Sequence, residues 1–313
     1  VLGGDRIKKA NGQWAIFEDV GSTPASMQAT RIAIALDAAV KMYQLLQSDC
    51  IRAYVQALLS GPKTFIRMPK AWWPKSWHKF ADPVCPLDYA LYGHPAAGDC
   101  WADRFAEVLL TLGFKKVEGW MAVFIHQGPN GDTVTFIVYV DDLVMLAGPR
   151  MIKLIGAVRE HIEMDEPAGL QKYLGVPHAK ECVELGGHVQ TTYTFEMRSY
   201  FNAIGERFIK ETGLKLTRVS TPNSPDLTAE EFIKLQERPG THEGCALSLI
   251  MAYNMYGSRM ALPTIAVVIQ RLATLLTKWA AEADSRLHRL ACYVHSHFGE
   301  ALTGCLQILT PLK

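Results

Sequence analysis

The sequence predicts an α+β fold, in which an antiparallel strand pair is combined with separate amphipathic helices. Residues 133–148 carry the strand pair: β-branched and aromatic residues fill the first half, and an apolar run fills the second. Two adjacent acids, Asp141 and Asp142, lie at the bend, and Gly148-Pro149 marks the end. Amphipathic helical patterns recur on either side of the pair, at 101–112, at 151–163 and, with a break at Pro263, through most of 245–298.

Length and composition bound the class of protein. With 313 residues, of which 49% are hydrophobic, the chain can bury a large core and form about two domain-sized units. Lys and Arg total 32 against 31 Asp and Glu, and this balance neither requires nor excludes nucleic acid, because a local basic cleft can lie on a neutral protein. Seven irregularly spaced cysteines indicate free thiols in a reducing compartment. No membrane span is expected, since the most apolar late stretch, 261–276, is interrupted by proline, glutamine and arginine.

The segment before the strand pair combines a predicted helix with an isolated acid. Thr23-Pro24 opens a largely apolar stretch that predicts a helix to about Leu46. Asp49 follows, just ahead of a short helical pattern. An aspartate in this position commonly caps a helix, so N-capping is the structural alternative for Asp49.

A loop-rich region at 61–86 contains three tryptophans, Trp72, Trp73 and Trp77. Indole rings can stack on nucleic-acid bases. Clusters of this kind more commonly pack against one another, and local packing is the favoured interpretation here.

The part of the chain after the strand pair alternates short strands with helices. Residues 170–175 predict a strand that ends at a glycine, and 189–194 predict a second strand. A helix is expected at 195–211, and the proline-rich segment 220–225 is expected to be a linker.

The acids at the bend have two interpretations. Asp-Asp between apolar runs is commonly a solvated turn, because Asp is a favoured turn residue. If the segment that carries Asp49 joins the same sheet, three carboxylates lie at one sheet end. That set suits two-metal nucleotidyl transfer, in which one Mg²⁺ lowers the pKa of a primer 3′-hydroxyl and the other, roughly 3.5–4 Å away, holds the triphosphate.

These residues stand in boxes that resemble those of reverse transcriptases. Tyr139-Val140-Asp141-Asp142 is similar to the Tyr-x-Asp-Asp box, and Asp49 through Ala53-Tyr54 is similar to the Asp-x-x-x-Ala-Tyr/Phe box. More closely, the chain resembles the copia-type retrotransposon reverse transcriptase. That resemblance runs in order through most of the chain, at 91–101, 136–148, 170–175, 220–222 and 256–263.

The resemblance implies roles for individual residues. Asp49, Asp141 and Asp142 would be catalytic and would bind Mg²⁺, with Mn²⁺ as an alternative ion. The nucleotide would lie against Arg52, Ala53 and Tyr54: the backbone around Arg52-Ala53 would meet the triphosphate, and the Tyr54 ring would exclude ribose at the 2′ position. Tyr173, Leu174 and Gly175 would grip the primer end. The partners would be an RNA or DNA template with a primer and deoxynucleoside triphosphates.

The resemblance also implies a right-hand polymerase fold with fingers, a palm containing an antiparallel sheet, and a helical thumb. Fingers are expected from 1–44 (in part) and 61–95, and the palm from 45–60 and 96–186. The helical thumb and the start of a connection domain are expected from 187–313. Two positions depart from the family pattern: Pro95 and Ala96 stand where the family has Lys and Gln. The contacts of this loop to the templating base and nucleotide are therefore not expected to carry over unchanged.

The function expected from the resemblance is RNA-directed DNA polymerisation, a nucleotidyl transfer to a primer 3′ end. Because Val1 is not an initiator methionine, the chain is expected to be one piece of a polyprotein whose ribonuclease H and integrase segments lie elsewhere. A cytoplasmic location, in a virus-like particle, or a nuclear one is expected. Two alternatives stay open: a catalytically decayed or domesticated remnant that binds nucleic acid without polymerising, and a non-enzymatic interaction protein in which the aspartates only form turns.

Overall fold

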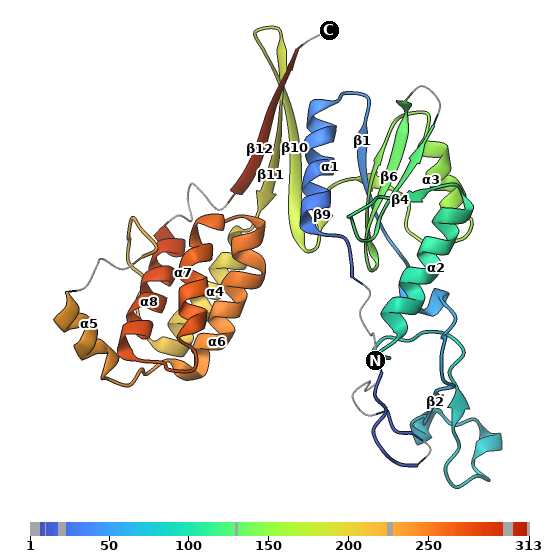
Figure 1. Cartoon of the computed structure of the whole chain (residues 1–313), viewed down its shortest axis with the longest axis horizontal. Coiled ribbons are helices and arrows are strands. Elements are labelled where there is room, and N and C mark those ends of the chain that lie inside the picture. The colour runs from blue at the N-terminus through green and yellow to red at the C-terminus, as the bar shows by residue number, and fades with distance from the viewer. Residues whose placement is uncertain are drawn as a thin grey trace. The chain divides into compact units, whose positions relative to one another are not determined.

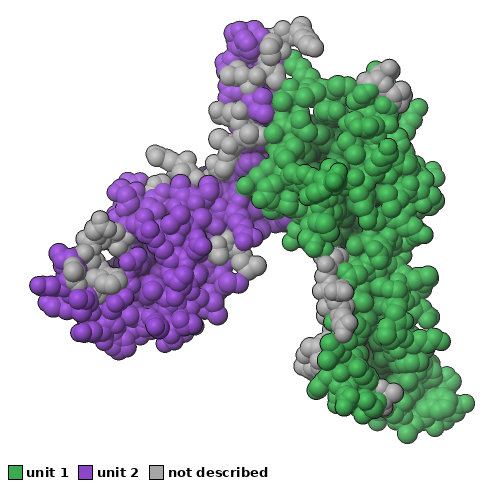
Figure 2. Space-filling model, viewed as in Figure 1, with its two compact units in different colours: residues 1–170 green, residues 171–313 purple. Residues whose placement is uncertain are grey.

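The computed structural model describes residues 7–9, 11–17, 23–128, 131–223, 228–296 and 303–311. The chain divides into two compact units, residues 1–170 and 171–313 (Figure 2). Both units combine helices with antiparallel strands, which confirms the α+β class (Figure 1). No helix among the described residues is both long and apolar enough to cross a membrane.

The first unit is built on a six-stranded sheet in which all neighbouring strands are antiparallel. The predicted strand pair is confirmed: β6 (Thr133–Tyr139) and β7 (Asp142–Ala147) form a hairpin at the centre of the sheet. The spatial order is β4 (Lys115–Lys116), β5 (Val123–Gln127), β6, β7, β1 (Gln44–Asp49) and β8 (Ala168–Gly169).

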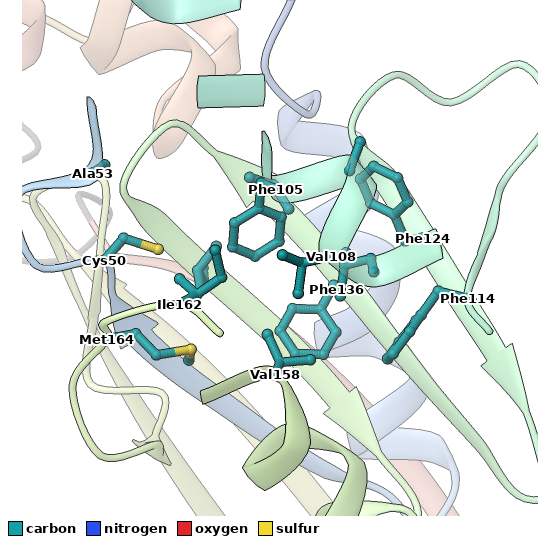
Figure 3. Packing of buried hydrophobic residues seen from close by; sticks show 14 of the residues in the cluster. Cys50, Ala53, Phe105, Val108, Phe114, Phe124, Phe136, Val158, Ile162 and Met164 are labelled. Atoms are coloured by element: carbon teal, nitrogen blue, oxygen red, sulfur yellow. The ribbon is translucent and has the colours of Figure 1, made fainter. Parts of the chain in front are cut away.

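Helices cover both faces of this sheet. Phe136 and Met145 belong to a buried cluster with residues of α2 (Ala97–Thr111) and α3 (Ile152–Arg159) (Figure 3). The opposite face is buried as well, and α1 (Met27–Ala39) contacts β1 and β7 on that side (Figure 1). A strand buried on both faces reads as a continuous apolar run, which explains the sequence of β7.

The helix predicted to continue to about Leu46 ends earlier, so that prediction is wrong for the residues after Ala39. Helix α1 stops at Ala39, and the chain enters β1 at Gln44. The buried carboxylate of Asp37 accepts a hydrogen bond from the backbone N–H of Leu45 at 3.0 Å, which fixes the reversal. Pairing of β1 with β7 supplies tertiary hydrogen bonds that outweigh the local helical pattern.

Residues 61–86 form an irregular segment around a two-stranded ladder. Strands β2 (Phe65–Ile66) and β3 (Cys85–Pro86) pair, and two 3₁₀ turns, η3 (Lys70–Trp72) and η4 (Lys75–Trp77), lie between them. Neither turn contains a buried residue, and Trp72 is 70% exposed. The expectation of a packed tryptophan cluster is therefore wrong for Trp72, because the segment is too short to bury three indoles.

The second unit joins a four-stranded sheet to a group of helices. The sheet order is β12 (Thr303–Pro311), β11 (His188–Glu196), β10 (Val176–Leu185) and β9 (Lys172–Tyr173). The helices are α4 (Arg198–Thr212), α5 (Ala229–Gln236), α6 (Glu243–Ala252), the π-helix η6 (Tyr253–Ser258), η7 (Pro263–Ile265), α7 (Ala266–Thr274) and α8 (Ala281–Ser296).

The predictions for this unit can be compared element by element. The expected strand at 189–194, the following helix and the helical region broken at Pro263 are all present. Strand β10 was not expected. The predicted linker is irregular over 220–223, and residues 224–225 lie outside the described residues. The unit boundary falls within the range predicted as the second palm segment, and the finger, palm and thumb ranges stay predictions.

Candidate active site

The antiparallel register of β1 with β7 brings two acids face to face. Asp49 is the direct partner of Asp142, and Tyr139 is the partner of Asp142 on the other side. Residues directly opposite in an antiparallel pair share one face of the sheet, so the two carboxylates lie side by side. Asp165 donates its backbone N–H to the carbonyl of Asp49 at 2.9 Å, which secures the end of β1.

Asp141 lies on the two-residue turn that connects β6 to β7. The first residue of the turn, Val140, has a φ of 59°, as the favoured two-residue hairpin turns require. A β-branched residue adopts this left-handed conformation only when its surroundings enforce it. Two hydrogen bonds do so: the indole N–H of Trp101 donates to the Val140 carbonyl, and the Cys50 N–H donates to the Asp141 carbonyl, both at 2.8 Å.

The three carboxylates repel one another. The pKa of Asp142 is raised from 3.8 to about 6 by burial, by the charges of Asp49 and Asp141, and by a side-chain hydrogen bond with Asp49. Burial and the charges of all three acids raise the pKa of the Cys50 thiol from 9.0 to about 12. Asp49, Asp141 and Asp142 thus all contribute to the negative potential at Cys50.

A divalent cation would relieve this repulsion, and the donor set fits one in part. Within the described ranges, no group of three or more His, Cys, Asp or Glu side chains is arranged to hold a metal ion by itself. Asp49 and Asp142 offer two adjacent carboxylates, while Asp141 stands exposed on the turn. One or two carboxylates are what Mg²⁺ takes from a protein when substrate phosphates and water complete its shell.

The segment that follows Asp49 is held by a side-chain clamp. Gln56 donates its amide N–H to the carbonyls of Ile51 and Glu163, and its amide oxygen accepts the N–H of Glu163 at 2.8 Å. Arg52, at the centre of this loop, has a left-handed backbone with φ 52° and ψ 48°. Its exposed guanidinium lies 3.3 Å from the Glu163 carboxylate.

Ala53 and Tyr54 begin the short helix η2 (Ala53–Gln56). Ala53 is completely buried, and Tyr54 is half-buried with its ring against Tyr92. Burial, the neighbouring Tyr92 and the charge of Asp141 raise the pKa of Tyr54. The predicted nucleotide residues therefore adjoin the acids in the first unit.

Comparison with known protein families shows which family the chain belongs to. Residues 8–207 match the family described as reverse transcriptase (RNA-dependent DNA polymerase). The chain belongs to this family. The match spans every element that carries Asp49, Asp141 and Asp142, and it supports a retroelement reverse transcriptase. At a significant level, no match was found among curated proteins or among solved structures.

The residues predicted to grip the primer in this reverse transcriptase lie in the second unit. Tyr173 ends β9 and is buried, and Leu174 and Gly175 form the turn into β10 with positive φ values of 47° and 82°. The Tyr256 hydroxyl donates to the Leu174 carbonyl. A Cβ atom on Gly175 would lie 2.7 Å from that hydroxyl oxygen, so glycine is required for this approach.

Sequence reasoning missed four residues that position the site of this reverse transcriptase: Trp101, Tyr92, Gln56 and Glu163. Trp101 and Tyr92 do fall within the box at 91–101 that carried the family resemblance, which was the available signal. Gln56 and Glu163 are separated by 107 positions in the chain, and no local pattern marks their contact.

Replacing Trp101 with Phe is expected to destabilise the turn. The change keeps an aromatic ring but leaves the Val140 carbonyl without its donor, which costs about 1–3 kcal/mol. Denaturant unfolding followed by circular dichroism measures the loss. Trp72→Phe, at an exposed indole, is the matched control and is expected to change the unfolding free energy by less than about 0.5 kcal/mol. Equal stabilities for the two variants would contradict the assigned role of Trp101.

The raised pKa of Asp142 predicts a pH dependence of stability in metal-free buffer. The folded state holds this proton up to about pH 6, whereas the unfolded chain releases it near 3.8, so the contribution of Asp142 to stability falls as pH rises between these values. Unfolding free energies of the parent chain and Asp142→Asn are compared at pH 4 and pH 7 with a chelator present. The difference between the two proteins is expected to change by about 1 kcal/mol, because solvent screens this half-exposed group. A pH-independent difference would show that Asp142 titrates normally.

Proposed function

We propose that the chain is a copia-type reverse transcriptase domain that adds deoxynucleotides to a primer 3′ end on an RNA or DNA template. The observation that carries this proposal is the pairing of Asp49 with Asp142 at the end of a buried antiparallel sheet, with Asp141 on the adjoining turn. Nucleotidyl transfer needs carboxylates held in this way. The ordered boxes in the sequence support the copia type.

Asp49, Asp141 and Asp142 are the residues that would hold Mg²⁺, or Mn²⁺ in its place. When bound, the ions neutralise the triphosphate and activate the primer 3′-hydroxyl. The chain positions the reactants by other means. The strand register pairs two carboxylates. By the resemblance, the backbone around Arg52-Ala53 would meet the triphosphate, and the Tyr54 ring would exclude the ribose 2′-hydroxyl.

The right-hand arrangement is part of the proposal. The six-stranded sheet supports a palm formed by 45–60 and 96–186, and helices α4 to α8 support a thumb within 187–313. Residues 1–44 and 61–95 are assigned to the fingers, and Tyr173 to Gly175 to the primer grip. The accompanying ribonuclease H and integrase segments, and a location in a cytoplasmic particle or the nucleus, rest on the resemblance alone.

Primer extension on an RNA template with Mg²⁺ and deoxynucleotides tests the proposal. Asp141→Asn and Asp142→Asn are each expected to lower incorporation at least about 100-fold, because each removes a charge that the ions require. Asp103→Asn, at an exposed acid on α2, is the matched control and is expected to extend at the parent rate. Chelation of the metal is expected to abolish extension by every variant.

Two outcomes would contradict the proposal. Undiminished extension by Asp141→Asn and Asp142→Asn would remove the acids from the mechanism. No extension by the parent chain, together with tight and salt-sensitive binding of the primer–template, would favour a remnant that binds nucleic acid without polymerising.

The segment 63–82 supports nucleic acid as the partner. It carries five basic residues and a single acid, Asp82, which is paired with Arg67 at 2.6 Å. The exposed aromatic side chains of Trp72, Phe65 and Phe80 are interleaved with these charges. Basic groups that follow the backbone, combined with exposed rings that stack on bases, are typical of single-strand binding surfaces.

Trp72→Ala is expected to weaken binding of a short single-stranded RNA by about five- to 100-fold. This is the effect expected when one base loses the aromatic ring on which it stacks. Fluorescence anisotropy of a labelled oligonucleotide at fixed salt measures the affinity. Leu247→Ala on α6 removes an apolar side chain that is 56% exposed and serves as the control. An unchanged affinity for Trp72→Ala would exclude stacking at this position.

A further inference from the structure

Tyr92, one of the residues that position the site, lies against the proposed nucleotide residues. Its ring centroid is 4.4 Å from that of Tyr54, with an angle of 39° between the ring planes. Both side chains are half-buried, so the pair has one face toward the protein and one toward solvent. Ring pairs at this separation contribute attraction beyond the area that they bury.

Backbone pairing delivers Tyr92 to this position. Leu59 donates its N–H to the Asp88 carbonyl, and Ala90 donates to the Ala57 carbonyl, both at 2.9 Å. Two residues further on, Tyr92 is therefore level with the η2 turn. Gly93 then reverses the chain with a φ of 96°, a conformation that suits glycine.

Small side chains allow the two segments to approach closely. Four alanines are at most 1% exposed around this junction: Ala53, Ala57, Ala90 and Ala97. None of them extends beyond a methyl group, so the loop with Tyr54, the segment with Tyr92 and the start of α2 can lie in direct contact. A larger side chain at any of them would separate the two tyrosine rings.

The Tyr92 hydroxyl lies beside the backbone of this loop. Burial and the charge of Asp141 raise the pKa of Tyr92, and they outweigh the backbone hydrogen bonds of Tyr54 and Ala53, which act to lower it. The hydroxyl therefore stays protonated at neutral pH while it accepts from the loop backbone. Tyr92 thus contacts the ring of Tyr54 and lies near enough to Asp141 to be affected by its charge.

We propose that Tyr92 is a positioning residue that sets the discrimination between deoxyribonucleotides and ribonucleotides by holding the Tyr54 ring in one orientation. The inference rests on the proposed polymerase function, in which the Tyr54 ring excludes the ribose 2′-hydroxyl. A ring that packs against a neighbouring ring on one side has fewer orientations to adopt. A ring without that neighbour can rotate away and admit the larger sugar.

The test compares the incorporation of one deoxynucleotide with that of the matching ribonucleotide by the full chain, as a ratio of kcat/KM values. Tyr92→Leu removes the ring and the hydroxyl, and the ratio is expected to fall at least about tenfold. Tyr92→Phe keeps the ring that packs against Tyr54 and loses the hydroxyl, and a smaller fall of about two- to fivefold is expected. Tyr89→Phe is the control, because Tyr89 is three residues away and 53% exposed, and its ratio is expected to match the parent value.

The ratio of kcat/KM for the deoxynucleotide to kcat/KM for the ribonucleotide distinguishes a positioning role of Tyr92 from general damage to the fold. A purely structural defect lowers both rates together and leaves the ratio unchanged. If Tyr92→Leu does not fold, the ratio of Tyr92→Met decides, since Met also removes the ring and its flexible side chain fills irregular space. An unchanged ratio, with deoxynucleotide incorporation retained, would overturn this inference alone. No incorporation by the parent chain would overturn the polymerase function and, with it, the role of Tyr92.

Discussion

The register of β1 with β7 is the constraint on which the acid site depends. It sets Asp49 opposite Asp142 and aligns Cys50 so that its N–H reaches the Asp141 carbonyl. A slip of one residue would turn Asp49 to the opposite face of the sheet and remove it from the other two acids. The register also pairs Leu45 with Leu146 and Leu46 with Met145, so a slip would replace these apolar cross-strand pairs with mismatched ones.

The acid site contains two energetically unfavourable features, and packing of the surrounding core must offset their cost. Burial and like charges raise the pKa of Asp142, and Val140 adopts a backbone conformation that valine disfavours. Both features lie at the end of the most deeply buried strands of the first unit, with the fully buried Trp101 ring packed on Phe105 behind the turn. Strain of this kind persists where packing over-determines the backbone, and it is typical of functional sites.

The elements that sequence reasoning predicted well were those with a strong local pattern. The β6–β7 hairpin follows from β-branched residues around a two-acid bend, and the helices of the second unit follow from their apolar spacing. Strand β1 was not separable from the preceding helix, because its pairing with β7, about 95 positions away, decides its conformation. The proximity of Asp49 to the hairpin was a conditional inference from the sequence, which the family resemblance then favoured. The contact of Tyr54 with Tyr92 depends on backbone pairing that no periodicity shows.

One continuous segment, 91–101, connects the two halves of the site. Tyr92 near its start contacts the loop that carries Tyr54, and Trp101 at its end holds the turn that carries Asp141. Pro95 and Ala96, the departures from the family pattern, lie between these two contacts, and neither contact uses their side chains. The loss of the family's Lys and Gln therefore leaves both anchors in place. The first turn of α2 separates them by a fixed helical rise, so the acids and the nucleotide loop are set relative to each other by the length of this segment.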